Sequence, residues 1–293
     1  TIFYMGINLG ALMSPFLAGY AAVTYGYRYG FLVAAVGMII CSLLFQTLGD
    51  KYLGDIGKHI KKDVRTMNDT VPLSKEEKDR IKVIMVFVVF SIFFFAGFEQ
   101  AGSSMTLYTE KYIDRTIGGF EIPTAWFQSV NPIFIILFSP LMTILWQRLS
   151  VRGKEPSIPT KMSMGMILLG IGFSVLYFAV LQRGGDIADE NVKAHILFII
   201  FTYMFHTFGE LCLSPIGLSM VSKLSPVKLA SLMMGVWLLS SFFANLLAGT
   251  LASYTNRLGA GTIFFFISVF SVLMGFVLLG LKKWLIRYSH GVL

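Results

Sequence analysis

Eight long apolar runs constrain the fold of this chain more than any other feature. A helix needs about 20 mostly apolar residues to cross a bilayer, and each run reaches that length. The runs lie at about 2–23, 29–48, 83–108, 126–148, 162–181, 195–221, 229–253 and 262–285. Helices satisfy their own backbone hydrogen bonds, so they can stand in lipid where an open strand cannot. We therefore predict an all-α, polytopic membrane protein with eight transmembrane helices.

The basic residues are concentrated in alternate connections between these runs. Of the 24 Lys and Arg residues, 18 lie in the stretches 49–82, 148–161 and 222–228 and in the C-terminal end from Lys282. Because cytoplasmic loops carry the excess of Lys and Arg, we expect linker 49–82 and the C-terminus to be cytoplasmic, in a multi-pass protein of the cell (inner or plasma) membrane. The basic charge follows the topology, so the lipid bilayer is the expected partner and nucleic acid is not.

The linker 49–82 is the only long polar segment, and it suggests a division of the chain. We expect 1–48 to hold the last two helices of one bundle, 49–82 to be a cytoplasmic linker and 83–293 to form a six-helix bundle. Ser74 and Glu77 have the spacing of a capping box that opens a helix running into the third span. Thr1 already lies in an apolar segment, so we expect the chain to be the C-terminal part of a longer protein.

The third run contains an acid, Glu99. An ionised side chain at mid-membrane costs about 2.5–3.5 kcal/mol even on a lenient scale, and such residues commonly have a function. Glu99, Ser103 and Thr106 have helical spacing, so we expect them to share one face. A carboxylate in this setting can exchange a proton, which favours Glu99 as a proton-coupling group. The alternative is a structural ion pair that locks two helices.

The sixth run contains the second acid, Glu210. The spacing predicts one polar stripe on this helix, formed by Tyr203, His206, Glu210, Ser214 and Gly217. Pro215 favours a distorted helix that lines a cavity. His206 and Glu210 could in principle share a metal ion, but two ligands without an HExxH pattern are a weak signal, so no metal is expected.

Amide and aromatic side chains supply further candidates. Gln128 and Asn131 precede Pro132 in the fourth run and are predicted to share a face. Their amides could orient a polar substrate or simply tie helices together, and the residue types do not decide between these. Asn8 in the first run is a similar case. Trp237 in the seventh run is, by residue type alone, more typical of packing than of ligand contact.

Enzyme chemistry has little support in the sequence. It has no phosphate-binding loop, no Ser/His/Asp arrangement and no Cys/His cluster. An intramembrane enzyme would need a nucleophile or a metal beside Glu99 or Glu210, so a binding or transport role is favoured over catalysis.

Five ordered motifs along nearly the whole chain resemble the proton-dependent oligopeptide transporter family of the major facilitator superfamily. They are Phe3-Tyr4 with Ile7-Asn8-Leu9-Gly10, Phe98-Glu99-Gln100 with Gly102-Ser103, Trp126–Pro132 (WFQSVNP), Gly209-Glu210-Leu211 with Leu213-Ser214-Pro215, and Trp237. The resemblance implies a major facilitator superfamily fold that lacks its first four helices, with the eight spans matching family helices 5 to 12. It also implies proton-coupled symport of di- and tripeptides by alternating access, with protons as the coupling ion and no cofactor.

The resemblance also implies roles for individual residues. Glu99 matches the acid of proton coupling, and Glu210 matches the acid associated with the peptide's amino terminus. Asn8 and Asn131 match amides that contact the peptide backbone, and Trp237 matches a residue lining a side-chain pocket. Gln128 and Ser214 are neighbours of these positions and complete the predicted substrate-binding set.

The sequence departs from the family pattern in two places. The E-x-x-E-R motif of family helix 1 and a basic residue of helix 4 are absent from this chain, so the cationic side of the pocket is expected from the missing N-terminal helices. Linker 49–82 is too short and too charged for the two extra helices found in many bacterial members. A transporter of another substrate, such as nitrate or a glycoside, would share the same fold.

Overall fold

The computed structural model describes residues 2–54, 72–187, 189 and 191–292. It divides into two compact units, Thr1–Pro72 and Leu73–Leu293. The first unit holds α1 (Ile2–Tyr25) and α2 (Tyr27–Leu53), which pack together where Gly30 meets Ala18. Most of the predicted linker, 55–71, lies outside the described residues, and the three-part division of the chain remains a prediction.

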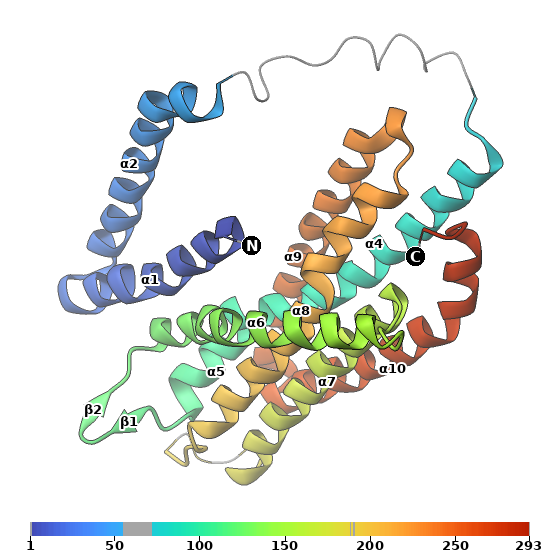
Figure 1. The fold of residues 1–293 in the computed structure, drawn as a ribbon. Helices are drawn as coiled ribbons and strands as arrows, with labels where there is room; N and C mark the ends of the chain where they lie inside the picture. The colour runs from blue at the N-terminus through green and yellow to red at the C-terminus, as the bar shows by residue number, and fades with distance from the viewer. Residues whose placement is uncertain (1, 55–71, 188, 190, 293) are drawn as a thin grey trace. The chain divides into compact units, whose positions relative to one another are not determined.

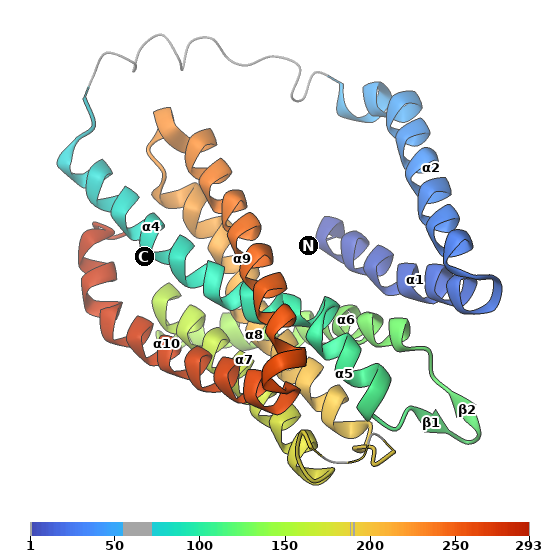
Figure 2. The same ribbon diagram turned by 180° about the vertical axis from the view of Figure 1, so that it is seen from behind.

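The second unit holds the remaining spans, shown from two sides in Figures 1 and 2. Its helices and strands, in chain order, are α4 (Lys75–Phe98), the 3-10 helix η1 (Glu99–Gly102), α5 (Ser104–Tyr112), β1 (Thr116–Ile117), β2 (Phe120–Glu121), the 3-10 helix η2 (Thr124–Ser129), α6 (Val130–Val151), α7 (Ile158–Gln182), α8 (Leu197–Leu224), the 3-10 helix η3 (Val227–Leu229), α9 (Ala230–Leu258) and α10 (Ala260–Tyr288).

The predicted eight spans are confirmed. Within the described residues, eight helical segments are long and apolar enough to cross a membrane. The capping box before the third span is also confirmed, because the Ser74 hydroxyl accepts from the Glu77 N–H and the Glu77 carboxylate accepts from the Ser74 N–H. This cap lets α4 begin at Lys75, eight residues before the apolar run that marks the span.

Helix α7 packs closely against both α8 and α10 (Figures 1 and 2). A Cβ at Gly165 of α7 would lie 2.8 Å from the carbonyl oxygen of Gly209 on α8, and the reverse distance is the same. On the other contact, the Ser163 hydroxyl donates to the Gly275 carbonyl of α10 at 2.7 Å, and the Ser268 hydroxyl donates to the Gly170 carbonyl at 2.8 Å. Small residues allow such approach between membrane helices.

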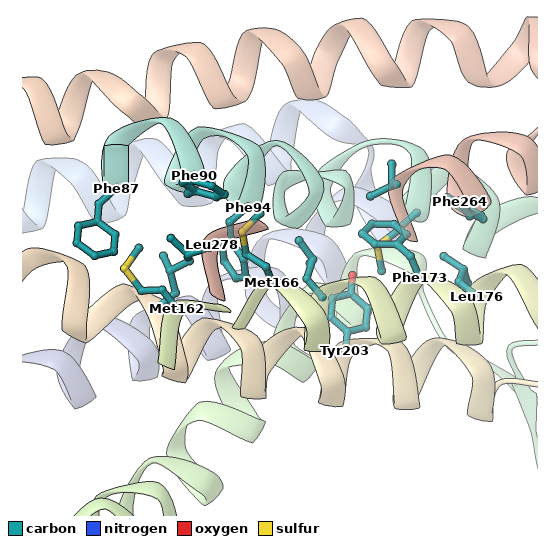
Figure 3. Close-up of a cluster of buried hydrophobic side chains, with 14 of the residues drawn as sticks. Phe87, Phe90, Phe94, Met162, Met166, Phe173, Leu176, Tyr203, Phe264 and Leu278 are labelled. Atoms are coloured by element: carbon teal, nitrogen blue, oxygen red, sulfur yellow. The ribbon is translucent and has the colours of Figure 1, made fainter. Parts of the chain in front are cut away.

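Aromatic, leucine and methionine side chains fill the interior between these helices and α4 (Figure 3). Phe87 and Phe94 come from α4, Met162 and Met166 from α7, and Phe264 from α10, and all five are fully buried. The packing of these side chains fixes the positions of the helices that carry the polar residues.

A β-hairpin follows α5 and was not predicted in the all-α interpretation. Strands β1 and β2 pair antiparallel, with Thr116 opposite Glu121. Gly118 and Gly119 form the two-residue turn with φ of 60° and 85°, and this left-handed backbone favours glycine. Arg115 pairs with Glu121 at 2.6 Å across the hairpin.

The connection from α7 to α8 is held by the buried Arg183 and by Asp186. The Arg183 guanidinium lies 3.9 Å from the centre of the Tyr112 ring and donates to the carbonyl of Val192 at 3.0 Å. The Asp186 carboxylate accepts from the Gly261 N–H at 2.9 Å, in the first turn of α10. This connection therefore joins the ends of α5, α7 and α10.

The connection from α6 to α7 carries an ion pair between Glu155 and Lys161. The hydrogen bond from Lys161 lowers the pKa of the Glu155 carboxyl below its ordinary value of 4.5. The Lys161 ammonium also lies 4.7 Å from the centre of the Trp146 ring on α6. Three residues thus tie α6 to the start of α7.

Candidate functional site

The third span is broken beside Glu99. Helix α4 ends at Phe98, the chain continues as a 3-10 turn, and Ser103 leaves the helical conformation with φ −133° and ψ −100° before α5 begins. The prediction of one continuous helix with Glu99, Ser103 and Thr106 on a shared face is therefore wrong. An apolar run of this length cannot by itself reveal a break, because the 3-10 turn is made of residues that a helix also accepts.

Side chains satisfy the backbone that the break exposes. The Ala101 carbonyl accepts from the Thr106 hydroxyl and from the Gln128 amide, both at 2.6 Å. The Gln128 amide also donates to the Thr106 hydroxyl at 2.8 Å. Irregular backbone at membrane depth needs such partners. Both N–H groups of Gln128 are therefore used inside the protein, and its role as a substrate contact remains a prediction.

Gln100 fixes the same break to α9. It is fully buried, and its amide donates to the carbonyls of Ala96 on α4 and Ala248 on α9, each at 3.1 Å. Its oxygen accepts from the Ser104 hydroxyl at 2.6 Å. With Gln100 turned into the protein, the adjacent Glu99 lies on the exposed side of this unit. Its carboxylate has no hydrogen bond or ion pair to any described residue.

The structure brings together Asn131 and Glu210, two residues predicted from different spans. Asn131 is the second residue of α6, where the following Pro132 fits because the first turn of a helix needs no partner for that nitrogen. Its Nδ2 donates to Glu210 Oε2 at 2.9 Å and to Thr207 Oγ1 at 3.1 Å. Glu210 is half-buried, and Thr207 is fully buried. An amide, a hydroxyl and an acid therefore form one polar cluster within the helices.

The polar stripe predicted on α8 is only partly at this cluster. Tyr203 and His206 are buried in the protein interior, with 3% and 1% of their surfaces exposed. Glu210 and Ser214 are half-buried, and the Ser214 hydroxyl has no hydrogen-bond partner among the described residues. Gly217 packs directly under the indole of Trp237. The stripe thus separates into two fully buried residues, two half-buried residues and a glycine that packs against α9.

The two remaining predicted residues lie apart from this cluster along the chain. Trp237 of α9 is buried, and a Cβ at Gly217 of α8 would collide with its indole. That is a packing contact, and a ligand contact by Trp237 stays a prediction. Asn8 is a buried residue of α1 in the first unit.

A metal centre has no support in the described residues. No group of three His, Cys, Asp or Glu side chains in the described ranges is placed to hold an ion. His206 instead lies against Gly172 of α7, with its ring centre 4.7 Å from that of Phe173. Because its imidazole lies against a glycine of the neighbouring helix, His206 packs α8 on α7.

The chain matches a known protein family over most of its length. The model of the POT family (PTR2) matches residues 1–52 and 45–264 of this chain. The chain belongs to the POT family. Among related sequences, the peptide transporter YePEPT of Yersinia enterocolitica is 29% identical over 317 residues, covering 87% of this chain and 61% of that protein. The dipeptide and tripeptide permease B of Xenorhabdus bovienii is 26% identical over 297 residues, covering 87% and 60%.

Solved POT structures share the fold. A crystal structure of a mutant of the peptide transporter POT in complex with alafosfalin matches with a TM-score of 0.85 and 27% identity, covering 98% of this chain and 67% of that one. The predicted major facilitator superfamily fold is confirmed. The chain spans about three fifths of the length of the two POT relatives above. These relatives have the names of transporters and not of enzymes.

Two residues, one at the cluster and one at the break in the third span, were not among the predicted site residues. Thr207 joins the Asn131–Glu210 pair, and Gln100 holds the break beside Glu99. A threonine in a helix rich in Phe and Met has no distinctive signal. The position of Gln100, next to an intramembrane acid, is a signal that could have drawn attention to it.

Proposed function

We propose that this chain forms part of a proton-coupled symporter of di- and tripeptides. The observation that carries the proposal is the pairing of Asn131 with Glu210 at 2.9 Å inside the helices of a POT-family chain. The names of the relatives, a peptide transporter and a dipeptide and tripeptide permease, support the substrate class.

The cluster suits the amino end of a peptide. A protonated amine offers three N–H donors, and an ionised carboxylate offers only acceptors. Glu210 would therefore bind the amine, with Asn131 beside it. Asn8, Gln128, Ser214 and Trp237 remain the further residues that we propose to contact the peptide.

The peptide carboxylate requires a cationic partner, which we assign to helices of the family fold beyond this chain. Transport would proceed by alternating access between two bundles of the membrane-spanning fold, with the site near the midplane. The distribution of Lys and Arg supports a cytoplasmic linker 49–82 and a cytoplasmic C-terminus in the cell membrane.

Glu99 is the residue we assign to proton coupling. It lies at a break in a membrane helix. A change of charge there can favour one conformation of the two helix ends over another. Coupling requires that proton and peptide each bind the two orientations with different affinity. Protonation of Glu99 would remove its charge and shift that balance.

The proposal is tested with the full-length protein in proteoliposomes. We expect a labelled dipeptide to accumulate against its gradient when the outside is acidic, and accumulation to stop when a protonophore is added. Unlabelled di- and tripeptides should compete, whereas nitrate and glycosides should not. Competition by nitrate or a glycoside but not by peptides would replace this substrate class with another of the same fold.

A further inference from the structure

Thr207 lies on α8, three residues before Glu210, and is fully buried. Its hydroxyl donates to the carbonyl of Tyr203 at 2.8 Å. A hydroxyl has one proton and two lone pairs. Because the proton is committed to Tyr203, the Thr207 oxygen can only accept a hydrogen bond from Asn131.

The Asn131 amide has two N–H donors, and both have acceptors. One acceptor is Glu210 Oε2 at 2.9 Å, and the other is Thr207 Oγ1 at 3.1 Å. The amide oxygen of Asn131 has no hydrogen-bond partner among the described residues. It is therefore the one atom of this amide that remains to bind a ligand, and it can only accept.

Glu210 alone would not hold the amide in this orientation. An ionised carboxylate accepts only, so it selects the N–H side of Asn131. A protonated carboxyl can also donate, so it would accommodate the oxygen side equally well. The Thr207 oxygen is unaffected by that proton, and a flipped amide would place two oxygens against each other with no hydrogen between them.

We propose that Thr207 is a positioning residue that keeps the Asn131 amide oxygen toward the ligand in both protonation states of Glu210. The inference rests on the proposed function, in which this cluster receives the peptide amine. With the amide held, Asn131 presents only an acceptor to the ligand at any pH, and ionised Glu210 does the same. This set suits a primary ammonium group and disfavours an acylated amine with its single N–H.

Other titratable or charged groups within the described residues lie on α8 and on the helices packed against it. They are Tyr203, His206, Cys212 and Lys223 on α8; Lys75, Glu76, Glu77, Lys78, Asp79, Arg80 and Lys82 at the start of α4, and Glu99 in η1 after α4; Arg148 on α6; Lys161 and Tyr177 on α7; and Tyr254 and Arg257 on α9. The Thr207 hydroxyl does not titrate, so a change at position 207 that alters a pH profile acts through Asn131 and Glu210.

The test compares the full-length wild type with Thr207→Val, which keeps the shape and loses the hydroxyl, and with Thr207→Ser, which keeps the hydroxyl. Binding of Ala-Ala and of N-acetyl-Ala-Ala is measured for each from pH 8 to pH 5. The readout is the ratio of the two dissociation constants, which a purely structural role would leave unchanged.

We expect wild type and Thr207→Ser to prefer the free amine across the whole pH range. In Thr207→Val the preference should fall by about three- to tenfold on acidification, the worth of about one hydrogen bond. Thr207→Ala serves the same comparison should the valine variant not fold.

Two results would overturn the inference: an unchanged ratio in Thr207→Val at every pH, or equal loss of preference in Thr207→Ser and Thr207→Val. Absence of binding of both peptides to the wild type would instead remove the proposed function, so the two failures are distinguishable.

Discussion

The amide nitrogen of Asn131 lies 2.9 Å from a carboxylate oxygen of Glu210 and joins the start of α6 to the middle of α8. The two residues are 79 positions apart in the chain, and neither is held by its own helix alone. The pair therefore fixes the geometry of the proposed ligand site, and the effects of substitutions at the two residues should not be additive.

Replacing Glu210 by Gln tests the amine contact. We expect weaker binding of peptides with a free amine by about ten- to a hundredfold, since a hydrogen bond to a charged group contributes about 1.5–3 kcal/mol. Amino-blocked peptides should change little. Glu110→Gln, an exposed residue on α5, is the matched control. Equal loss for both peptide types would remove the assignment of Glu210 to the amine.

Replacing Glu99 by Gln tests proton coupling. Glutamine keeps the shape of the side chain and cannot exchange the proton, so uphill uptake driven by a pH gradient should disappear. Exchange of labelled for unlabelled peptide should continue, because exchange needs no net proton movement. Counterflow and gradient-driven uptake in the same proteoliposomes separate the two activities. Concentrative uptake at the wild-type level would rule out the coupling role.

Replacing Gln128 by Leu tests whether this amide holds the break in the third span. The Ala101 carbonyl would keep the Thr106 hydroxyl and lose its second donor, and the loss of one such hydrogen bond costs about 0.5–1.5 kcal/mol. We expect a lower unfolding temperature in detergent with an unchanged ratio of free-amine to amino-blocked peptide binding. Gln147→Leu, exposed on α6, is the control. A changed ratio without loss of stability would make Gln128 a substrate contact instead.

Adding a methyl group at Gly165 tests the packing of α7 on α8. In Gly165→Ala the new Cβ would lie 2.8 Å from the Gly209 carbonyl oxygen, so the helices must separate. Overpacking of this kind costs about 1–3 kcal/mol, and thermal unfolding should report it. In Gly280→Ala on α10 the Cβ would meet no atom within 4 Å, so that variant should be as stable as the wild type or more so. Equal stability of the two variants would contradict the close contact.

The ion pair between Glu155 and Lys161 predicts a pH-dependent contribution to stability. The pKa of Glu155 is lowered in the folded protein, so the contribution is present above about pH 4.5, the ordinary value, and is lost as the pH falls through the lowered value. Glu155 is partly exposed, which limits the effect to about 0.2–1 kcal/mol. Glu155→Gln should therefore lower the unfolding temperature at pH 7, and this difference should shrink as the pH falls below about 4.5. A temperature difference that stays the same from pH 7 to acidic pH would contradict the pair.

The sequence predicted the framework because hydropathy and capping act locally. The spans depend on runs of apolar residues, and the Ser74 cap depends on two side chains three residues apart. The break at Glu99–Ser103 depends on a donor, Gln128, that is distant in the chain, so no local pattern could predict it. The hairpin had a local signal in Gly118-Gly119 between Thr-Ile and Phe-Glu, and two-stranded pairing can be predicted from such a turn.

In the candidate site, too, some features follow from local sequence and others depend on residues distant in the chain. Residue type predicted that Glu210 and Asn131 have polar roles, because acids and amides are costly among lipid-facing side chains. Which of the amides meets the acid depends on how α6 crosses α8, and this is set by packing. Gln128 and Asn131, only three residues apart, bind different partners because the helix begins between them.

The contact of α7 with α8 and α10 through glycine backbone gives this half of the protein an internal reference frame. Carbonyl oxygens stand where even a methyl group would not fit, so these three helices cannot slide past one another without losing the contact. Spectroscopic labels placed on α7 and α10 should keep one fixed separation through the whole transport cycle. Labels on α4 or α9, measured against that pair, would then report the movement itself.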